Sequence, residues 1–239
     1  MAISTHGRSN SILSRSGLHL GASADEVTFR AGEIILRANQ TTSHVFFPVS
    51  VVAAFVRRLL DGSTIEAGMV GNEGAIGIEA MFGATAQPSD VIVVVEGTAI
   101  RVPAAAAGTA FDEERGFRRL VLRFANAFTL QVGQSAACNW LHPLDRRLAR
   151  WLLKVADRMA GPARTGAIEI ALTQEFLASM LGARIAGISE AVSALTASGL
   201  IRHRRHVIEI VDRAALETAC CECYATVRRL YERDEVCDH

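Results

Sequence analysis

The 239-residue sequence has no long hydrophobic run, although half of its residues are hydrophobic. A membrane-spanning helix needs about 18 or more consecutive apolar residues, and runs such as Val91–Val95 have only the length of a strand. The first residues, MAISTHGRSNSILSRSG, lack the apolar core of a signal peptide. We therefore expect a cytoplasmic protein without a membrane partner, in which residues 1–17 form a flexible tail.

The sequence also lacks the short motifs that mark many enzymes. It contains no GxSxG nucleophile elbow, no phosphate-binding Walker loop and no HExxH zinc motif. Glu66, Glu73 and Glu79 are acids without a partner histidine, and positions in a pocket or on the surface explain them equally well. We predict that the protein is not an enzyme and has no catalytic residue and no cofactor.

Cysteine is scarce, with five residues, four of them among the last 20. Their number and spacing do not indicate a disulfide framework, and reduced thiols are usual in the cytoplasm. The segment ACCECY invites a zinc or redox site, because thiolates bind zinc. The competing pattern is an apolar helical face that contains two of the cysteines: Leu216, Cys220, Cys223, Val227 and Leu230. We prefer buried thiols on a terminal helix, with no metal site and with Cys221 as the most exposed thiol.

Net charge is absent too, because 25 basic and 25 acidic residues cancel. The two halves of the chain nevertheless differ. Residues 1–113 carry 7 basic and 11 acidic side chains, whereas residues 114–239 carry 18 and 14. We expect the two halves to meet different partners.

The acidic half has the pattern of short strands separated by glycine turns. β-Branched and aromatic residues gather in five segments: Glu33–Leu36, Val45–Phe47, Val51–Val56, Thr64–Val70 and Val91–Val95. Turn residues such as those of Gly71–Gly74 lie between them. This spacing favours an antiparallel double sheet or barrel over alternating parallel βαβ units.

A long helix is predicted to follow, over Phe117–Ser135. Its apolar residues recur every three or four positions and form one face: Phe117, Val121, Phe124, Phe128 and Val132. This face packs either on the helix's own domain or on a second copy of the chain. We prefer the second interpretation and predict that these five residues form the interface of a homodimer.

Two short helices and a basic hairpin are predicted between Leu172 and Ile210. Thr173 occupies an N-cap position, and Gly182 permits the left-handed turn that ends the first helix. A second helix follows from about Ile185, and a basic turn between two β-rich runs comes after it. This order of elements is typical of a winged helix-turn-helix that binds double-stranded DNA.

The predicted DNA contacts lie on the second helix and on the hairpin. Small and polar side chains on the helix permit close approach to base edges, and a glutamate accepts a hydrogen bond from cytosine. Arginines near the hairpin tip are suited to phosphate groups. The predicted DNA-binding residues are Arg184, Ala186, Ser189, Glu190, Ser193, Arg202, Arg204 and Arg205.

Together these segments resemble the Crp/Fnr family of transcription regulators over roughly residues 18–215. LTQEFLASMLG…ISEAVSALTASGLI carries the resemblance most specifically, and VGNEGAIGIEAMFG (Val70–Gly83) is similar to the family's sensor-pocket turn. The resemblance implies an α+β fold with an N-terminal antiparallel β-roll (double-sheet, cupin-like), a long dimerisation helix and a C-terminal winged helix-turn-helix. It also implies a homodimer that binds a palindromic promoter site, has RNA polymerase as a partner and often responds to a small effector.

The resemblance divides the chain into five parts. Residues 1–17 are the tail, 18–113 the cyclic-nucleotide-binding-like sensor domain and 114–141 the dimerisation helix. Residues 142–215 are the DNA-binding domain, and residues 216–239 are a helical extension. One alternative stays open: a ligand-binding or thiol/redox-sensing module that uses the C-terminal cysteines and whose helix-turn-helix contacts a protein.

The predicted effector pocket departs from that of family members that bind cyclic nucleotides. Those members hold the ribose with a Gly-Glu turn and the cyclic phosphate with an Arg-Ser pair. Glu73-Gly74 is similar to the first element, but Pro88-Ser89 stands at the second, so the arginine is missing. Proline supplies neither a charge nor an N–H group. The predicted pocket residues are Gly71, Glu73, Gly74 and Ser89, and the effector is unknown, with cyclic AMP not expected.

Two further departures limit what the resemblance implies. The best-known members read bases with an Arg, a Glu and a further Arg, and the similar positions here hold Ile185, Ala186 and Glu190. Their target sequence therefore does not transfer. Oxygen-sensing members hold an iron–sulfur cluster with N-terminal cysteines, which this sequence lacks.

Overall fold

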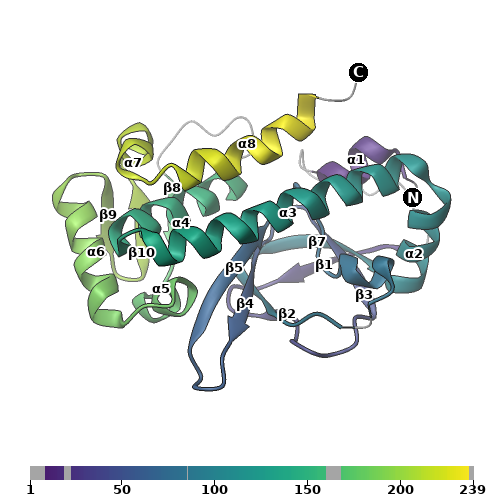
Figure 1. Cartoon of the computed structure of the whole chain (residues 1–239), viewed down its shortest axis with the longest axis horizontal. Coiled ribbons are helices and arrows are strands. Elements are labelled where there is room, and N and C mark those ends of the chain that lie inside the picture. Colours follow the sequence, from purple (N-terminus) through teal and green to yellow (C-terminus); the bar gives the residue numbers. More distant parts are fainter. Residues whose placement is uncertain (1–8, 19–22, 85, 160–167, 237–239) are drawn as a thin grey trace. The chain divides into compact units, whose positions relative to one another are not determined.

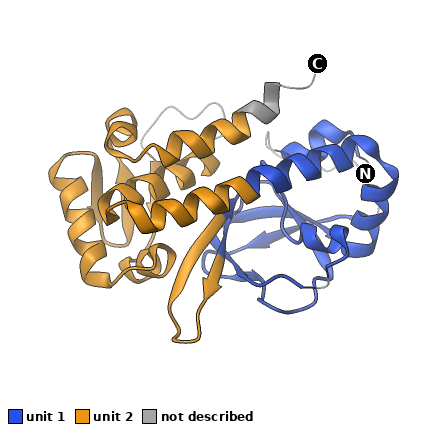
Figure 2. Cartoon of the chain, viewed as in Figure 1, with its two compact units in different colours: residues 1–55, 69–128 blue, residues 56–68, 129–239 orange. Residues whose placement is uncertain are grey.

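The computed structural model describes residues 9–18, 23–84, 86–159 and 168–236. The chain divides into two compact units (Figure 2). The first consists of residues 1–55 and 69–128, and the second of residues 56–68 and 129–239. In the described part of the chain, each helix is too short or too polar to cross a bilayer.

Two β-sheets lie largely in the first unit (Figure 1). One has the order β1–β7–β3, with strands Asp25–Phe29, Gly97–Pro103 and His44–Pro48. The other has the order β2–β6–β4–β5, with strands Ile34–Leu36, Asp90–Val95, Val52–Arg58 and Thr64–Val70. β7 pairs antiparallel with β1 and β3, and β6 pairs antiparallel with β2. The predicted antiparallel double sheet is confirmed, and all five predicted segments overlap strands.

Short helices complete the first unit: α1 (Ser11–Ser16), the 3-10 helix η2 (Ile78–Phe82) and α2 (Ala104–Glu113). α1 corrects the prediction of a flexible tail over residues 1–17, of which 1–8 lie outside the described residues. The side chain of Asn10 caps α1, is buried, and donates hydrogen bonds to the carbonyls of Pro48 and Gly74 at 3.0 and 2.7 Å. The segment is ordered because its cap also binds the backbone of the sheet domain.

The long helix α3 spans Arg115–Leu141, six residues beyond the predicted end at Ser135. Its phenylalanine face packs on the sheets of the first unit. The rings of Phe117 and Phe47 lie 6.0 Å apart, and those of Phe128 and Phe55 lie 4.7 Å apart. Phe117, Val121 and Phe124 are buried within a single chain. The predicted dimer interface is therefore wrong for these three residues, because a helical period identifies a buried face but not the surface that buries it.

The second unit contains the winged helix-turn-helix. Its elements in chain order are α4 (Leu144–Met159), β8 (Ile168–Ala171), α5 (Gln174–Leu181), α6 (Ile185–Ala197), β9 (Ile201–Arg204) and β10 (Val207–Ile210). β10 lies between β8 and β9 and pairs antiparallel with both. α4 packs against α5 and α6 and supplies many of the buried side chains, among them Trp151 and Leu152.

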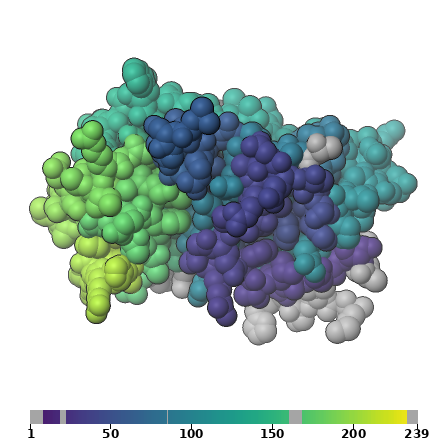
Figure 3. Space-filling view, turned by 90° about the horizontal axis from the view of Figure 1, so that it is seen from below, coloured from purple at the N-terminus to yellow at the C-terminus, as the bar shows by residue number. Residues whose placement is uncertain are grey.

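The outer part of the β4–β5 hairpin, residues 56–68, belongs to this second unit. The hydroxyl of Thr64 lies 2.7 Å from that of Ser179 in α5. Two residues further along β5, the carboxylate of Glu66 accepts a hydrogen bond from the ammonium of Lys154 in α4 at 2.5 Å, with both side chains buried. In Figure 3 the dark-blue residues of the hairpin border the green helix-turn-helix residues, and Thr64 makes the contact. Contacts between distant segments thus stabilise this unit.

Two helices end the described chain, α7 (Arg213–Ala219) and α8 (Cys223–Val236). They correct the prediction of one terminal helix, because residues 220–222 form a break between them. The break changes the positions of the thiols. Cys221, predicted to be the most exposed, is only 4% exposed, whereas Cys220 is partly exposed. Cys237 lies outside the described residues.

Candidate nucleic-acid interface

The helix-turn-helix begins and ends as its local sequence predicts. The side-chain oxygen of Thr173 accepts a hydrogen bond from the backbone N–H of Phe176 at 3.1 Å and so caps α5. Hydrogen bonds from its own backbone N–H and from Thr173 lower the pKa of the Glu175 carboxyl. Gly182 ends α5 in the left-handed region, at φ 57°. A Cβ atom there would lie 2.9 Å from Ile65, so glycine also permits close contact with the hairpin.

Helix α6 has one buried face and one exposed face. The buried residues are Ile188, Ala191, Val192 and Leu195. The opposite, exposed residues, Ala186, Glu190, Ser193 and Ala197, are spaced 4, 3 and 4 positions apart. Three of these four have small side chains, and Glu190 carries the charge. The face is shaped for close approach to a groove, with one hydrogen-bond acceptor at its centre.

Two of the predicted DNA-binding residues at α6, Arg184 and Ser189, differ in their exposure to solvent. Arg184 is the residue before the first turn and is exposed. Ser189 is partly buried, and its hydroxyl donates to the side-chain oxygen of Gln174 in α5. The structure therefore places Arg184 at the exposed surface and uses Ser189 to join the two helices.

The wing is a tight hairpin of β9 and β10. Arg205 and His206 form its turn, and His206 has a φ of 60°. Arg205 is exposed at the tip. Arg202 donates to both carboxylate oxygens of Glu209 across the hairpin, at 2.9 and 2.7 Å, and Arg204 lies 3.6 Å from the same carboxylate. The three predicted wing arginines are thus unequal, because Glu209 already compensates part of the charge of two of them.

The predicted effector residues lie in the first unit. The carboxylate of Glu73 accepts from the backbone N–H of Gly71 at 3.1 and 3.2 Å and so helps to close its own turn. A Cβ atom on Gly74 would lie 2.1 Å from the ring of Phe124, so only glycine permits α3 to pack at this turn. Ser89 is 7% exposed. Gln87, two residues earlier, is buried, and its amide nitrogen has no hydrogen-bond partner in the described chain.

Burial also affects an acid in η2, the short helix that follows this turn. Burial raises the pKa of the Glu79 carboxyl, and a hydrogen bond from its own backbone N–H opposes the shift only in part. Among the described residues, one of its oxygens has no hydrogen-bond partner. Glu79 is therefore an acid in a poorly solvated position, where the neutral form of its side chain is favoured more than in water.

Two protein-family models match the chain in the regions of these two sites. A cyclic nucleotide-binding domain matches residues 26–114, and a Crp-like helix-turn-helix domain matches residues 146–219. The chain belongs to the Crp/Fnr family of transcription regulators. No curated protein sequence matches it.

Solved structures share the fold at low sequence identity. FixK2 from Bradyrhizobium japonicum is 16% identical, with a TM-score of 0.68 over 83% of this chain and 98% of its own. A transcriptional regulator of the CRP family from Thermus thermophilus is 22% identical, with a TM-score of 0.66 over 81% of this chain and 95% of its own. At these identities the likeness shows the fold alone.

Sequence reasoning missed two features of this Crp/Fnr protein that bear on the site. The sequence pattern marked Glu209 only as one residue of an alternating strand. Its position opposite Arg202 follows from a two-residue turn that begins at Arg205. The pairing of Glu66 with Lys154 had no local signal, because the two residues lie far apart in the sequence.

Proposed function

We propose that this Crp/Fnr regulator acts in the cytoplasm as a homodimer, binds a palindromic promoter site through two copies of α6, and has RNA polymerase as a partner. The observation that carries the proposal is the exposed face of α6, on which Glu190 stands between small side chains. Two such helices related by a two-fold axis would read half-sites about one helical turn, or roughly 34–36 Å, apart.

The proposed contacts divide between base reading and phosphate binding. Glu190 accepts a hydrogen bond from a cytosine N4 amino group, while Ala186 and Ser193 let the helix enter the groove. Arg184 and Arg205 are exposed beside this face and bind phosphates irrespective of base sequence. This arrangement supports DNA as the partner of the helix-turn-helix, where a protein contact was the alternative.

Glu190→Ala tests the base-reading contact. The preferred duplex is first selected from a random pool with the wild-type protein, and binding is then measured by fluorescence anisotropy. We expect Glu190→Ala to lose discrimination at one base pair per half-site, by about 1–3 kcal/mol. The matched control is Glu26→Ala, which removes an exposed acid from the first unit. Unchanged discrimination in Glu190→Ala contradicts the role of Glu190, and failure to select any duplex contradicts DNA binding.

The dimer is proposed to form through the outer face of α3. Six exposed residues follow one stripe at spacings of 4, 4, 3, 4 and 3: Leu122, Asn126, Leu130, Gly133, Ala137 and Trp140. Such spacing is that of a two-helix seam, in which a single asparagine can fix the register of the two helices.

Gly133 supports this assignment, since a Cβ atom there would meet nothing within 4 Å in the chain. The glycine is thus not required by its own unit, and it lets a second helix approach closely. Leu122, Leu130 and Trp140 are 49%, 48% and 88% exposed in the single chain, so a second copy of α3 would remove a large apolar surface from water.

Leu130→Asp tests this seam by sedimentation equilibrium. A charge in the seam is left without a partner, so we expect monomers at a concentration where the wild type is dimeric. The control is Leu59→Asp, which changes an exposed leucine outside α3. A wild-type protein of one-chain mass at micromolar concentration overturns the dimer. A Leu130→Asp protein that remains dimeric overturns the seam but leaves the dimer.

The effector is proposed not to be cyclic AMP. Pro88 provides no charge for a cyclic phosphate, and the carboxylate of Glu73 is directed back to its own turn. Without an arginine, burial of that anion is unfavourable by several kcal/mol. Calorimetric titration with cyclic AMP and with cyclic GMP tests the proposal. Binding of either nucleotide at micromolar concentration contradicts it.

A further inference from the structure

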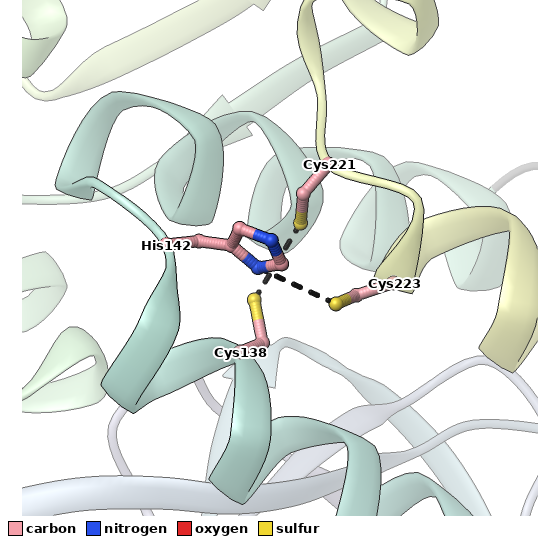
Figure 4. A group of neighbouring side chains, drawn as sticks. All are labelled: Cys138, His142, Cys221 and Cys223. Carbon is pink, nitrogen blue, oxygen red and sulfur yellow. Dashed lines mark hydrogen bonds between the residues drawn. The ribbon is translucent and has the colours of Figure 1, made fainter.

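Four side chains that bind metals in many proteins converge in the second unit. The sulfur atoms of Cys138, Cys221 and Cys223 and a ring nitrogen of His142 all lie within 4.8 Å of one another. The sulfurs of Cys138 and Cys221 are 3.5 Å apart, and the sulfur of Cys223 is 3.5 Å from Nδ1 of His142. Figure 4 shows all four side chains directed toward one point. We call these four residues the Cys–His cluster.

The backbone brings the ligands in from two places. Cys138 lies in the last turn of α3, and the N–H of His142 donates to its carbonyl at 3.1 Å, so the two side chains share one helical face. Cys221 and Cys223 come from the break between α7 and α8. The break lets these two thiols face the same point. In a continuous helix, side chains two residues apart do not face each other.

The distances fit a single tetrahedral ion. Zinc binds thiolates at about 2.3 Å and imidazole nitrogens at about 2.0–2.1 Å. A tetrahedron with these bonds places two sulfurs about 3.8 Å apart, and a sulfur and a nitrogen about 3.6 Å apart. The two separations of 3.5 Å are close to these edges, and the other ligand atoms lie within 4.8 Å of one another. An iron–sulfur cluster distributes its ligands over several irons and needs a wider opening. We propose that the Cys–His cluster binds one Zn²⁺ ion.

The surroundings of the cluster are those of a structural zinc site. With Nδ1 of His142 facing the sulfurs, its Nε2 lies 3.4 Å from the carboxylate of Glu222. A ligating histidine commonly has a carboxylate partner of this kind, which sets its tautomer and orientation. The amide nitrogen of Gln134 donates to the sulfur of Cys223 at 3.0 Å. The three cysteines are at most 4% exposed, so the four protein ligands would enclose the ion without an open position for a substrate.

The position of the cluster indicates what the ion does. Residues 143–220, which contain the winged helix-turn-helix, lie between its two pairs of ligands. Zinc would join the end of α3 to the start of α8 and so clamp both ends of the DNA-binding domain. Because metal-binding free energy contributes to folding, loss of the ion should loosen α8 first. This inference does not depend on the DNA target, the dimer seam or the effector.

Metal analysis of the full-length protein, purified without added metal and under reducing conditions, tests the assignment. We expect one zinc per chain by plasma mass spectrometry, and loss of most of it in Cys138→Ser and in Cys221→Ser. The control is Cys220→Ser, which should keep its zinc. Cys220 adjoins Cys221 in sequence, but its sulfur lies 3.9 Å from the carbonyl of Arg146 and outside the cluster. Iron in place of zinc overturns the assignment.

A second measurement uses proteins that keep all four ligands, so it does not require the cysteine variants to fold. Wild-type protein depleted of metal is titrated with Co²⁺, whose visible absorption is strong in a tetrahedral thiolate site. Glu222→Gln keeps all four ligands and should weaken zinc binding about 10–100-fold in chelator competition, as expected for the partner of a ligating histidine. Hydrogen exchange in α8 should quicken when zinc is removed. Absence of both zinc and tetrahedral Co²⁺ in the wild-type protein overturns the proposal.

Discussion

The helix-turn-helix takes its residues from one stretch, 173–197, whereas the Cys–His cluster joins residues 138–142 to residues 221–223. In the first region, sequence neighbours set the structure, as Thr173 caps α5 and Gly182 ends it. In the second region, each thiol depends on how distant segments pack. The buried pair of Glu66 and Lys154 is also of this second kind. The candidate DNA-reading surface therefore follows from residues close together in the sequence. Polar contacts between residues far apart in the sequence fix its position in the unit.

The largest effect on stability is expected for Glu66→Ala, which breaks a contact between distant segments. This change leaves the Lys154 ammonium buried without its counter-charge, and we expect a loss of about 3–5 kcal/mol in the free energy of unfolding. Urea denaturation measures it. The double variant Glu66→Leu with Lys154→Met removes both charges and should be close to the wild type in stability. A single variant as stable as the double variant would show that the pair does not hold the hairpin to α4.

The same pair should make stability depend on pH. Burial raises the pKa of the Glu66 carboxyl, but Lys154 outweighs it, so that pKa lies below the ordinary 4.5. Below pH 4.5 the unfolded chain therefore takes up a proton first, and the stabilisation by Glu66 is lost as pH falls through its folded pKa. Burial lowers the pKa of Lys154 to about 8 from 10.5, despite the attraction of Glu66. Between these pH values the unfolded chain binds the proton and the folded chain does not, so the contribution of Lys154 to the free energy of unfolding rises with pH.

Urea unfolding across these two ranges measures the effect. The double variant carries neither charge, so its stability should lack these changes in both the acidic and the alkaline range. Its remaining groups should titrate as in the wild type. If the wild type and the double variant lose stability equally on acidification, the acid sensitivity has another source.

A smaller effect is expected on the local side, in Thr173→Ala. The change removes the oxygen that accepts from Phe176, and loss of a helix cap costs about 1 kcal/mol. Thr173→Ser keeps the acceptor and serves as the control in the same urea experiment. A loss as large as that of Glu66→Ala would contradict the comparison, since α5 would then depend on its cap as much as the unit depends on its buried ion pair.

The smallest expected effects distinguish the wing arginines. Arg205→Ala should lower the salt dependence of DNA binding by about one phosphate contact. Arg202→Ala should lower it less, because Glu209 already compensates that charge. Anisotropy titrations over a range of salt concentrations give both slopes, and neither variant should alter base preference. Equal slopes would show that DNA displaces Glu209 from Arg202.

Much of the fold follows from short-range pattern. All five segments rich in β-branched and aromatic residues became strands, because alternation and glycine turns act within a few residues. The strands Asp25–Phe29 and Gly97–Pro103 have weaker patterns and were not named individually. α1 was missed since its cap, Asn10, is fixed by carbonyls of Pro48 and Gly74. The phenylalanine face of α3 was recognised as buried, but its partner was wrongly assigned.

The candidate sites divide in the same way. Glu190, Ala186 and Ser193 could be placed on one exposed face from helical spacing alone, whereas the bond from Ser189 to Gln174 depends on how α5 and α6 pack. The cysteines show the limit most clearly. Their spacing fitted a continuous helix, and nothing in that pattern indicated the break at residues 220–222.

By itself the sequence determined the family, the order of sheet domain, long helix and winged helix-turn-helix, and the exposed face of α6. These depend on periodicity, caps and turns, which act between residues close in the chain. Only the tertiary structure decided which face of α3 is covered, which wing arginines are paired with Glu209, and that Cys138 and His142 meet Cys221 and Cys223. Such contacts join segments that become neighbours only after the chain has packed, so no local pattern records them.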